Sequence, residues 1–203
     1  MATLHRVLAV PAVYRLWTAL VAPSDGRKAF ADTYVRPNAG DRVLDIGCGP
    51  ADIVPWLGAV DYVGFDANPE YIASATANYG DRATFRCQRV SEESLAEEPS
   101  FDIVLAQGIV HHLDDTEARH LFDVAHRALR RGGRLVTIDP AFAERQSPFA
   151  RMVVARDRGE HVRPFQAYVD LASRSFPETR AELRHDLLRI PYTHAILSCT
   201  KTT

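Results

Sequence analysis

The amino-acid sequence predicts a doubly wound, Rossmann-like α/β fold with a mostly parallel sheet. Segments of strand length alternate with segments of helical spacing between residues 41 and 140, as in chains built from βαβ units. The strand segments are almost continuously apolar, which is typical of parallel strands covered on both faces. No repeat or linker divides the 203 residues. We therefore expect a single domain, residues 1–203, with N-terminal capping helices and a C-terminal antiparallel hairpin.

The elements follow from the spacing of apolar residues. Helices are expected within residues 1–36, with a break at Pro11 and a second helix from Ser24 to Val35. The core at residues 41–140 is expected to contain a helix at 115–130 that ends at the glycine pair Gly132-Gly133. Its other elements are expected to be strands at 41–46, 60–65, 83–90, 101–106 and 134–138 and helices at 52–58 and 69–78.

The chain after residue 140 is organised differently. Residues 141–165 lack the alternation and are rich in Arg, Pro and Phe. Long unpatterned segments in compact domains are usually lids or binding loops, and this one follows the carboxyl end of a strand, where ligands bind in such sheets. We expect a lid or substrate segment there. Residues 166–203 are expected to form a helix at 166–173 and a closing hairpin of strands 181–190 and 193–200.

Composition excludes several classes of function. The net charge of −2 comes from 24 basic and 26 acidic residues without a basic patch, so we expect no nucleic-acid partner. No apolar run approaches the ~20 residues needed to cross a bilayer, so we expect no membrane association. Cys48, Cys87 and Cys199 are widely spaced and fit neither a metal site nor a disulfide framework. A reducing cytoplasm is the expected location, and the oligomeric state is not predicted.

The sharpest motif is Val43-Leu44-Asp45-Ile46-Gly47-Cys48-Gly49-Pro50, at the first strand-to-helix turn. Glycines there allow the backbone to approach a ligand closely, and the following helix N-terminus favours anionic groups. A nicotinamide dinucleotide would require a third glycine, but Asp52 occupies that position. A carboxylate is a poor neighbour for a pyrophosphate, so the motif argues against a dinucleotide.

The motif resembles the first motif of the class I S-adenosylmethionine-dependent methyltransferases, in which D-x-G-x-G follows an apolar strand. The resemblance extends from about Tyr34 to Pro140. Asp66, which ends the second predicted strand about 20 residues after the glycine turn, matches the acidic residue of the family that binds the ribose hydroxyls. Phe101-Asp102-Ile103-Val104 resembles the family's fourth-strand motif, and residues 128–135 resemble its helix end, turn and fifth strand.

The resemblance implies S-adenosylmethionine as cofactor and S-adenosylhomocysteine as product. It implies that the turn Gly47-Cys48-Gly49 accepts the methionine part, while Asp45 orients the turn or the cofactor's amino group. It places Asp66 on the ribose, because a carboxylate offers two acceptor oxygens to a vicinal diol. Three further positions would lie near the adenine or the sulfonium: Ala67, Asn68 and Gln107. Alternatively, Asp45 and Asp66 are ordinary strand-end carboxylates that accept hydrogen bonds from backbone amides.

Two positions depart from the family pattern. Ala51 stands where members commonly have a third glycine, and we expect it to narrow the pocket only slightly. After the third strand, an acidic residue often meets the adenine amino group, but this chain has Gln88-Arg89-Val90. Arginine cannot accept that hydrogen bond. Either Gln88 or the backbone accepts it, or the adenine is bound less tightly.

Two consecutive histidines, His111 and His112, are candidates for catalysis. A sulfonium methyl is already activated, so orienting the acceptor supplies much of the rate. A general base is needed only for an acceptor that is protonated at neutral pH, such as a hydroxyl. An imidazole suits that role, and His111 is nearer the strand end and therefore nearer the predicted cofactor site. The alternative is that one of the two rings packs under the next helix.

The predicted lid supplies candidate acceptor-binding residues. Arg158, His161 and Arg163 are suited to an acidic or phosphorylated acceptor, or are ion-paired residues of surface turns. Tyr14, Trp17 and Tyr34 either cover the pocket or belong to the core. No metal site is expected. The sequence predicts methyl transfer to a small molecule, with oxygen as the preferred acceptor atom. The alternatives are a cofactor-binding protein without transfer activity and an enzyme that uses the same cofactor for non-methyl chemistry.

Overall fold

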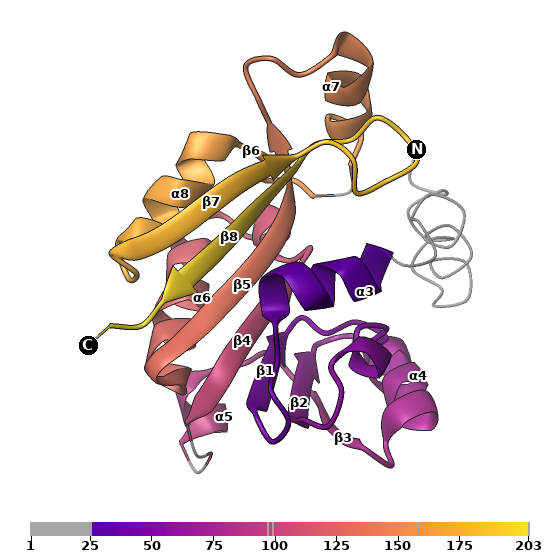
Figure 1. Ribbon diagram of the computed structural model, residues 1–203, viewed down its shortest axis with the longest axis vertical. Coiled ribbons are helices and arrows are strands. Elements are labelled where there is room, and N and C mark those ends of the chain that lie inside the picture. The colour runs from indigo at the N-terminus through magenta and orange to yellow at the C-terminus, as the bar shows by residue number, and fades with distance from the viewer. Residues whose placement is uncertain (1–25, 97, 99, 158, 203) are drawn as a thin grey trace.

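A computed structural model of the chain describes residues 26–96, 98, 100–157 and 159–202 (Figure 1). The first described element is α3 (Gly26–Phe30), which continues as one turn of π-helix, η1 (Ala31–Val35). The helix predicted from Ser24 is therefore seen from Gly26 onward. It ends at Arg36, in the left-handed conformation, just before Pro37. The break expected at Pro11 lies outside the described residues.

The sheet has the predicted mixed architecture, and its main path runs in the order β3-β2-β1-β4-β5-β8-β7. Neighbours among β1 to β5 pair in parallel, whereas β8 pairs antiparallel with both β5 and β7. The short β6 (Arg163–Pro164) pairs with the end of β5. The strands are β1 (Arg42–Ile46), β2 (Asp61–Asp66), β3 (Ala83–Cys87), β4 (Phe101–Gln107), β5 (Leu129–Phe142), β7 (Glu178–Arg184) and β8 (His194–Thr200).

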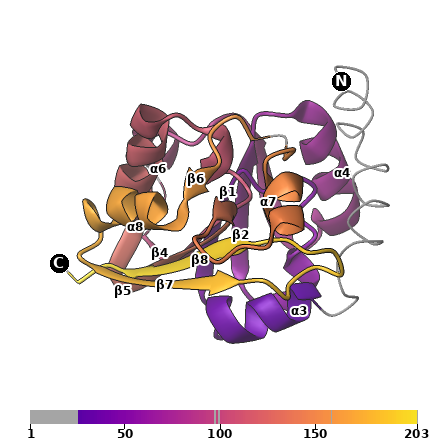
Figure 2. The same cartoon turned by 90° about the horizontal axis from the view of Figure 1, so that it is seen from above.

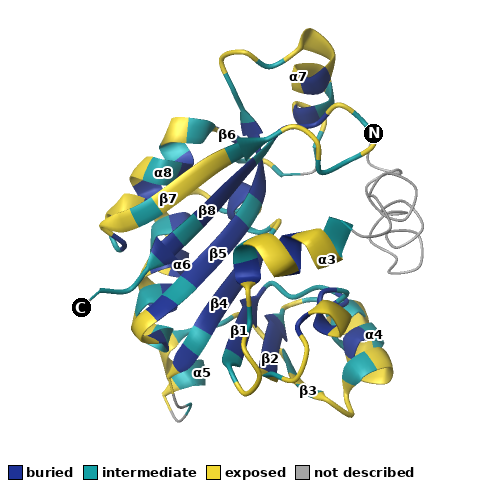
Figure 3. Ribbon diagram, viewed as in Figure 1, coloured by how far each residue is buried: buried dark blue, intermediate teal, exposed yellow. Residues whose placement is uncertain are grey.

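Helices cover both faces of this sheet (Figure 2). One apolar cluster lies between the sheet and α6 (Asp115–Ala128) and α8 (Phe165–Ser173). A second cluster joins the opposite face to residues of α3, η1, η2 (Val54–Trp56) and α4 (Pro69–Tyr79). The central strands are therefore buried, while the edge strand β7 is largely exposed (Figure 3). In the part of the chain that the structure describes, no helix has the length and apolar character needed to span a bilayer.

The helix predicted at 115–130 begins as expected but ends earlier. The Asp114 side chain accepts hydrogen bonds from the N–H groups of Thr116 and Glu117, which fixes the first turn. The helix ends at Ala128 because Leu129 is extended and buried. Gly132 is therefore not the cap of this helix. It lies within β5 at φ 78°, where the pairing with β4 shifts register between Leu129 and Arg134, and its N–H donates to the carbonyl of Lys201.

Three further elements differ from the prediction. The segment 141–165 contains a helix, α7 (Pro148–Val154), in which Ser147 caps the N-terminus and Pro148 occupies the first turn. The strand predicted at 181–190 is shifted to β7, because its register is set by pairing with β8. A short helix that was not predicted, α5 (Glu92–Leu95), lies between β3 and β4. The carboxyl ends of β1, β2 and β4 and the short η3 (Val110–His112) form the region that contains the candidate site.

Candidate functional site

A cavity of about 400 Å³ opens at the carboxyl ends of β1, β2 and β4. This is the edge at which doubly wound sheets bind their ligands, and the volume lies within the range of small-molecule pockets. The side chains and backbone that line it come from α3, β1, the glycine turn and its continuation, β2, α4, β4 and the segment after β4. They are Arg27, Asp45, Gly47, Cys48, Gly49, Pro50, Asp52, Ile53, Asp66, Tyr71, Gln107, Gly108, Ile109 and His112.

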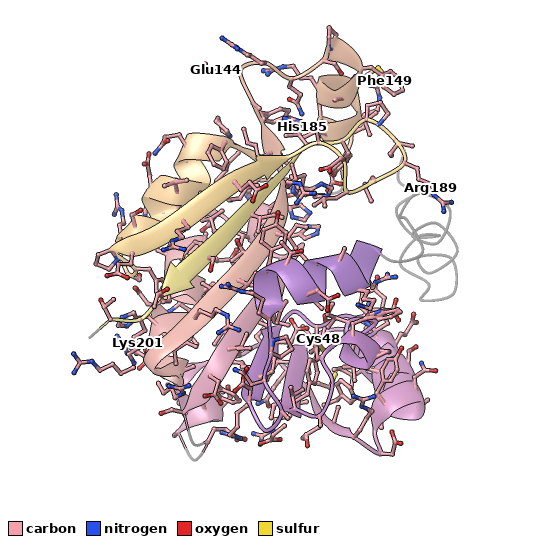
Figure 4. All side chains as sticks on the ribbon, in the orientation of Figure 1. Cys48, Glu144, Phe149, His185, Arg189 and Lys201 are labelled. Atoms are coloured by element: carbon pink, nitrogen blue, oxygen red, sulfur yellow. The ribbon has the colours of Figure 1, made fainter. Side chains whose placement is uncertain are left out.

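The glycine turn lines this cavity with backbone that carries no side chain at Gly47 and Gly49. Gly47 and Gly49 have φ values of 72° and 54°, a region that side-chain-bearing residues rarely adopt. A Cβ on Gly47 would lie 3.0 Å from Ile109 Cδ1, whereas a Cβ on Gly49 would have no atom within 4 Å. The N–H groups of Gly47 and Cys48 both donate to the Phe65 carbonyl, at 2.8 and 3.0 Å. The turn is thus tied to β2, and Cys48 lies next to α3 in Figure 4.

Asp66 lies at the end of β2 with both carboxylate oxygens bound to backbone amides. Oδ2 accepts from Gly49 N–H at 2.9 Å, and Oδ1 accepts from Asn68 N–H at 2.8 Å. This is the arrangement expected for a structural carboxylate at a strand end. Each oxygen retains a second lone pair, and Asp66 also lines the cavity. The same geometry therefore holds the carboxylate ready for a ligand.

Asp45 is a buried carboxylate with an unsatisfied oxygen. Oδ2 accepts from the Tyr62 hydroxyl at 2.7 Å, while Oδ1 has no hydrogen-bond partner among the described residues. Burial raises the pKa of Asp45 to about 6, against the hydrogen bond from Tyr62; the nearby charge of Asp66 raises it further, and the Gln107 side chain lowers it. A buried, unsatisfied acceptor is costly. A cationic or hydrogen-bond-donating ligand group in the cavity would relieve that cost.

None of the residues predicted to lie beside the adenine lines the cavity. Ala67 and Asn68 do not line it, and the Asn68 side chain caps α4 by accepting from the N–H groups of Glu70 and Tyr71. Gln88, Arg89 and Val90 follow the end of β3 and also lie outside the lining, and Arg89 pairs with Glu117 at 3.1 Å. Tyr71 of α4 lines the cavity beside Asp66. It was not predicted, because its first-turn position in α4 carries no motif.

The two histidines differ sharply in environment. His111 is buried, and its ring nitrogens contact two carboxylates: Nδ1 lies 2.8 Å from Asp139 Oδ1 and Nε2 lies 3.1 Å from Asp157 Oδ1. Burial disfavours the charged ring, but the hydrogen bonds to Asp139 and Asp157 outweigh it and raise the pKa of His111 to about 9. His112 is exposed and lines the cavity, with its ring centroid 4.2 Å from that of His111.

The three predicted acceptor-binding residues that the structure describes do not line the cavity. Arg163 is buried and donates to backbone carbonyls and to Asp115. The His161 N–H donates to the His111 carbonyl at 2.9 Å. The Tyr34 hydroxyl donates to Glu182 at 3.1 Å and accepts from Arg184 at 2.5 Å. The remaining three candidates, Tyr14, Trp17 and Arg158, lie outside the described residues.

Two further residues of the cavity escaped sequence reasoning. Arg27 of α3 approaches Asp52 at 3.4 Å, and both side chains line the cavity. Arg27 belongs to no recognisable motif, and Asp52 was considered only as the residue that argues against a dinucleotide. Their meeting depends on how α3 packs across the sheet.

Residues 43–133 match the family model described as "Methyltransferase domain". This match spans the strands and turns that build the cavity. The chain is a methyltransferase.

Two relatives are named as methyltransferases. This methyltransferase is 27% identical over 173 residues to an uncharacterized methyltransferase of Anoxybacillus flavithermus, covering 79% of the chain and 73% of the relative. It is 35% identical over 109 residues to the 27-O-demethylrifamycin SV methyltransferase of Amycolatopsis mediterranei, covering 50% of the chain but only 39% of that enzyme.

Solved structures share the fold at low sequence identity. Phosphoethanolamine N-methyltransferase 2 of Haemonchus contortus, in complex with S-adenosyl-L-methionine, superposes with a TM-score of 0.76 at 15% identity. The alignment covers 98% of this methyltransferase and 59% of the nematode chain. The [4+2]-cyclase SpnF gives a TM-score of 0.67 at 16% identity, covering 87% and 80% of the two chains. Identities this low show the fold alone.

Proposed function

We propose that this methyltransferase transfers the methyl group of S-adenosylmethionine to an oxygen atom of a small-molecule acceptor. The observation that carries the proposal is the single cavity that combines the glycine turn, the unsatisfied Asp45 and the strand-end Asp66 with an exposed imidazole, His112. The first three suit a cofactor with a ribose and an ammonium group. The imidazole suits the removal of a proton from a hydroxyl.

The residues present fit the cofactor. Asp66 would accept from the ribose hydroxyls, and the buried Asp45 would pair with the ammonium group of the methionine part. Arg27 lines the same cavity, and its planar guanidinium matches a carboxylate. The methionine part carries both an ammonium and a carboxylate group, so Asp45 and Arg27 provide the complementary charges. Gly49 has no side chain and so leaves room for the cofactor to approach the backbone closely.

The bound cofactor supplies an activated methyl group on a sulfonium, so the chain's own residues need to orient the acceptor and remove its proton. His112 is the better candidate for proton removal because it lines the cavity. Position along the chain favours His111. However, both nitrogens of that ring already contact carboxylates, and a raised pKa keeps the ring protonated at neutral pH. His111 would have to lose a contact and a proton before acting as a base.

Thermal unfolding with S-adenosylmethionine, S-adenosylhomocysteine or NAD tests the cofactor. A ligand at 100 times its Kd stabilises the folded state by about 2.7 kcal/mol, which corresponds to roughly 5–10 °C for a domain of this size. We expect that shift with the two sulfur nucleosides and none with NAD. Asp66→Ala should abolish it, whereas the control Asp61→Ala, at the exposed start of β2, should retain it. A shift with NAD alone would overturn the proposal.

Two acceptor probes test the transfer step, and the readout is the formation of S-adenosylhomocysteine. One probe is 27-O-demethylrifamycin SV, which carries a hydroxyl group. The Amycolatopsis relative is named after this molecule. The other is phosphoethanolamine, an amine. The proposal is supported if the hydroxyl is methylated and the rate of its methylation falls at least tenfold in His112→Ala, because a general base contributes ~10²–10⁴-fold. Methylation of the amine alone would overturn the choice of oxygen. Cofactor binding with no S-adenosylhomocysteine formed would favour a binding protein or non-methyl chemistry.

A further inference from the structure

The segment between α7 and β6 packs directly onto His111. Asp157 Oδ1 lies 3.1 Å from Nε2 of the ring, and the His161 N–H donates to the His111 carbonyl at 2.9 Å. Between them, Gly159 lies so close that a Cβ would be 2.0 Å from His111 Cδ2 and 2.6 Å from its carbonyl oxygen. The segment thus contacts both the ring and the backbone of His111, and only glycine fits at its centre.

Asp157 is itself held in place. Its Oδ2 accepts from the Tyr192 hydroxyl at 2.5 Å, and its Oδ1 accepts from the Gly159 N–H at 3.1 Å. Tyr192 is buried and lies just before β8. These contacts lower the pKa of Asp157, with the hydrogen bonds to His111 and Tyr192 outweighing the burial that would raise it. The carboxylate is therefore ionised and anchored on two sides.

The contact between Asp157 and His111 affects the cavity because His111 and the cavity-lining His112 both belong to η3. His111 and His112 are neighbours in this single turn, and their rings lie 4.2 Å apart with a 37° tilt. His112, Ile109 and Gly108 line the cavity. Contacts that hold the His111 ring in place therefore also hold the His112 ring in its orientation toward the cavity.

We propose that Asp157 and Gly159 are positioning residues for methyl transfer, which act by clamping His111 so that His112 is held toward the acceptor. The clamp consists of the Asp157 carboxylate on Nε2, the close packing of Gly159 on the ring, and the Asp139 carboxylate on Nδ1. This inference rests on the proposed function, since it assigns the clamp a role in orienting the base. Asp139 lies on β5, so the clamp joins the sheet to the segment after α7 across one imidazole.

The charges around His111 come from several elements, and a titration must take all of them into account. Two carboxylates contact the ring, and the other titratable groups nearby lie on η3, the segment before β6, α8, β8 and the loop before it. These groups are Asp139, Asp157, His112, His161, Tyr168, Tyr192 and His194. Removing Asp157 leaves Asp139 as the one contacting carboxylate among the described residues, so the proton on His111 should be lost at lower pH.

The test uses the full chain and the variants Asp157→Ala, Asp157→Asn and Gly159→Ala, with Asp61→Ala as a control for loss of an exposed carboxylate. Histidine ring NMR measures the titration of His111. Diethyl pyrocarbonate modification, located by mass spectrometry, measures its accessibility. In the wild type and the control we expect a protonated, unmodified His111 at pH 7.5. The Asp157 variants should lower its titration midpoint by at least one pH unit. Asp157→Ala and Gly159→Ala should allow its modification.

Two further measurements separate the clamp from the cofactor site. The affinity for S-adenosylhomocysteine, measured by calorimetry, should stay within twofold in all variants. With whichever probe the wild type methylates, kcat should fall at least tenfold in Asp157→Ala and Gly159→Ala at an unchanged KM for S-adenosylmethionine. Asp157→Asn keeps the shape of the side chain and should lose less activity. An unchanged His111 titration and kcat in Asp157→Ala would overturn the clamp. Absence of S-adenosylhomocysteine binding in the wild type would instead overturn the proposed function.

Discussion

Replacing Arg163 with alanine should destabilise this methyltransferase strongly, although its sequence context predicts a role in acceptor binding. The side chain is only 9% exposed. Its Nε and Nη2 donate to Asp115 Oδ1 at 3.0 and 2.9 Å. Nη1 donates to the carbonyls of Val110 and His161, both at 3.0 Å, and Nη2 donates to that of Leu113 at 2.6 Å. The guanidinium thus ties β6 to both ends of η3.

The size of the effect follows from these partners. Asp115 is 62% exposed, so its ion pair contributes little. The three carbonyls matter more, because each buried acceptor that loses its donor costs about 1–3 kcal/mol, at the lower end where water can enter. Loss of packing between the guanidinium and the Tyr168 ring, 5.8 Å away, adds somewhat under 1 kcal/mol. We expect a total loss of about 3–5 kcal/mol, which lowers Tm by roughly 6–20 °C.

Urea and thermal unfolding followed by circular dichroism measure this loss. Arg163→Lys should be intermediate, because an ammonium keeps the charge but cannot reproduce the fork that meets several carbonyls. Arg180→Ala, an exposed arginine of β7, should change stability by less than about 0.5 kcal/mol. A loss below about 1 kcal/mol in Arg163→Ala, together with a raised KM for the acceptor, would refute the structural role and restore the role in acceptor binding.

Three further predictions concern ionisation and backbone strain. Burial raises the pKa of Asp45 to about 6, so the affinity for S-adenosylhomocysteine, measured by calorimetry, should weaken as pH falls through 6. The same dependence in Asp45→Asn would contradict this. The pKa of His111 rises from 6.5 to about 9 on folding, so its contribution to stability is complete below pH 6.5 and is lost as pH rises through 9. Urea unfolding across that range should show a smaller decline in His111→Gln, and an equal decline would exclude His111 as the cause. Ala51 has φ 56°, so Ala51→Gly relieves about 1 kcal/mol of strain and adds a similar unfolded-state entropy. It should be neutral within about 1 kcal/mol, whereas Ala51→Val should lose about 2 kcal/mol or more; equal stability of the two variants would refute the argument.

The parts of the fold that could be predicted are those determined by local sequence. Apolar runs marked the more deeply buried parallel strands, because a strand buried on both faces has no polar side, whereas the edge strand β3 has no buried residue and a weaker pattern. The glycine turn was recognisable because Gly47 and Gly49 require positive φ whatever surrounds them. α7 was missed although Ser147 and Pro148 are ordinary start signals, because a helix of only 7 residues shows little periodicity.

Residues whose environment is set by distant contacts could not be placed in this way. Ala51 was expected to affect the width of the pocket, yet it does not line the cavity, and its cost lies in the left-handed backbone. Arg27 carries no motif and reaches the cavity only because α3 packs over the glycine turn. Arg163 belongs to a charged, turn-rich stretch of the kind that usually lies at a surface, but pairing of β6 with β5 buries it.

The histidine pair shows most clearly why sequence alone could not assign catalysis. His111 and His112 are the same residue type, adjacent in one turn, and any rule based on composition or on distance from the strand end treats them alike or prefers His111. Their difference arises from two carboxylates that lie 28 and 46 positions further along the chain, Asp139 and Asp157. Those carboxylates contact both ring nitrogens of His111, whereas His112 lines the cavity. The chemistry of the site is therefore determined by how β5 and the segment after α7 return to η3, which is a property of the tertiary structure.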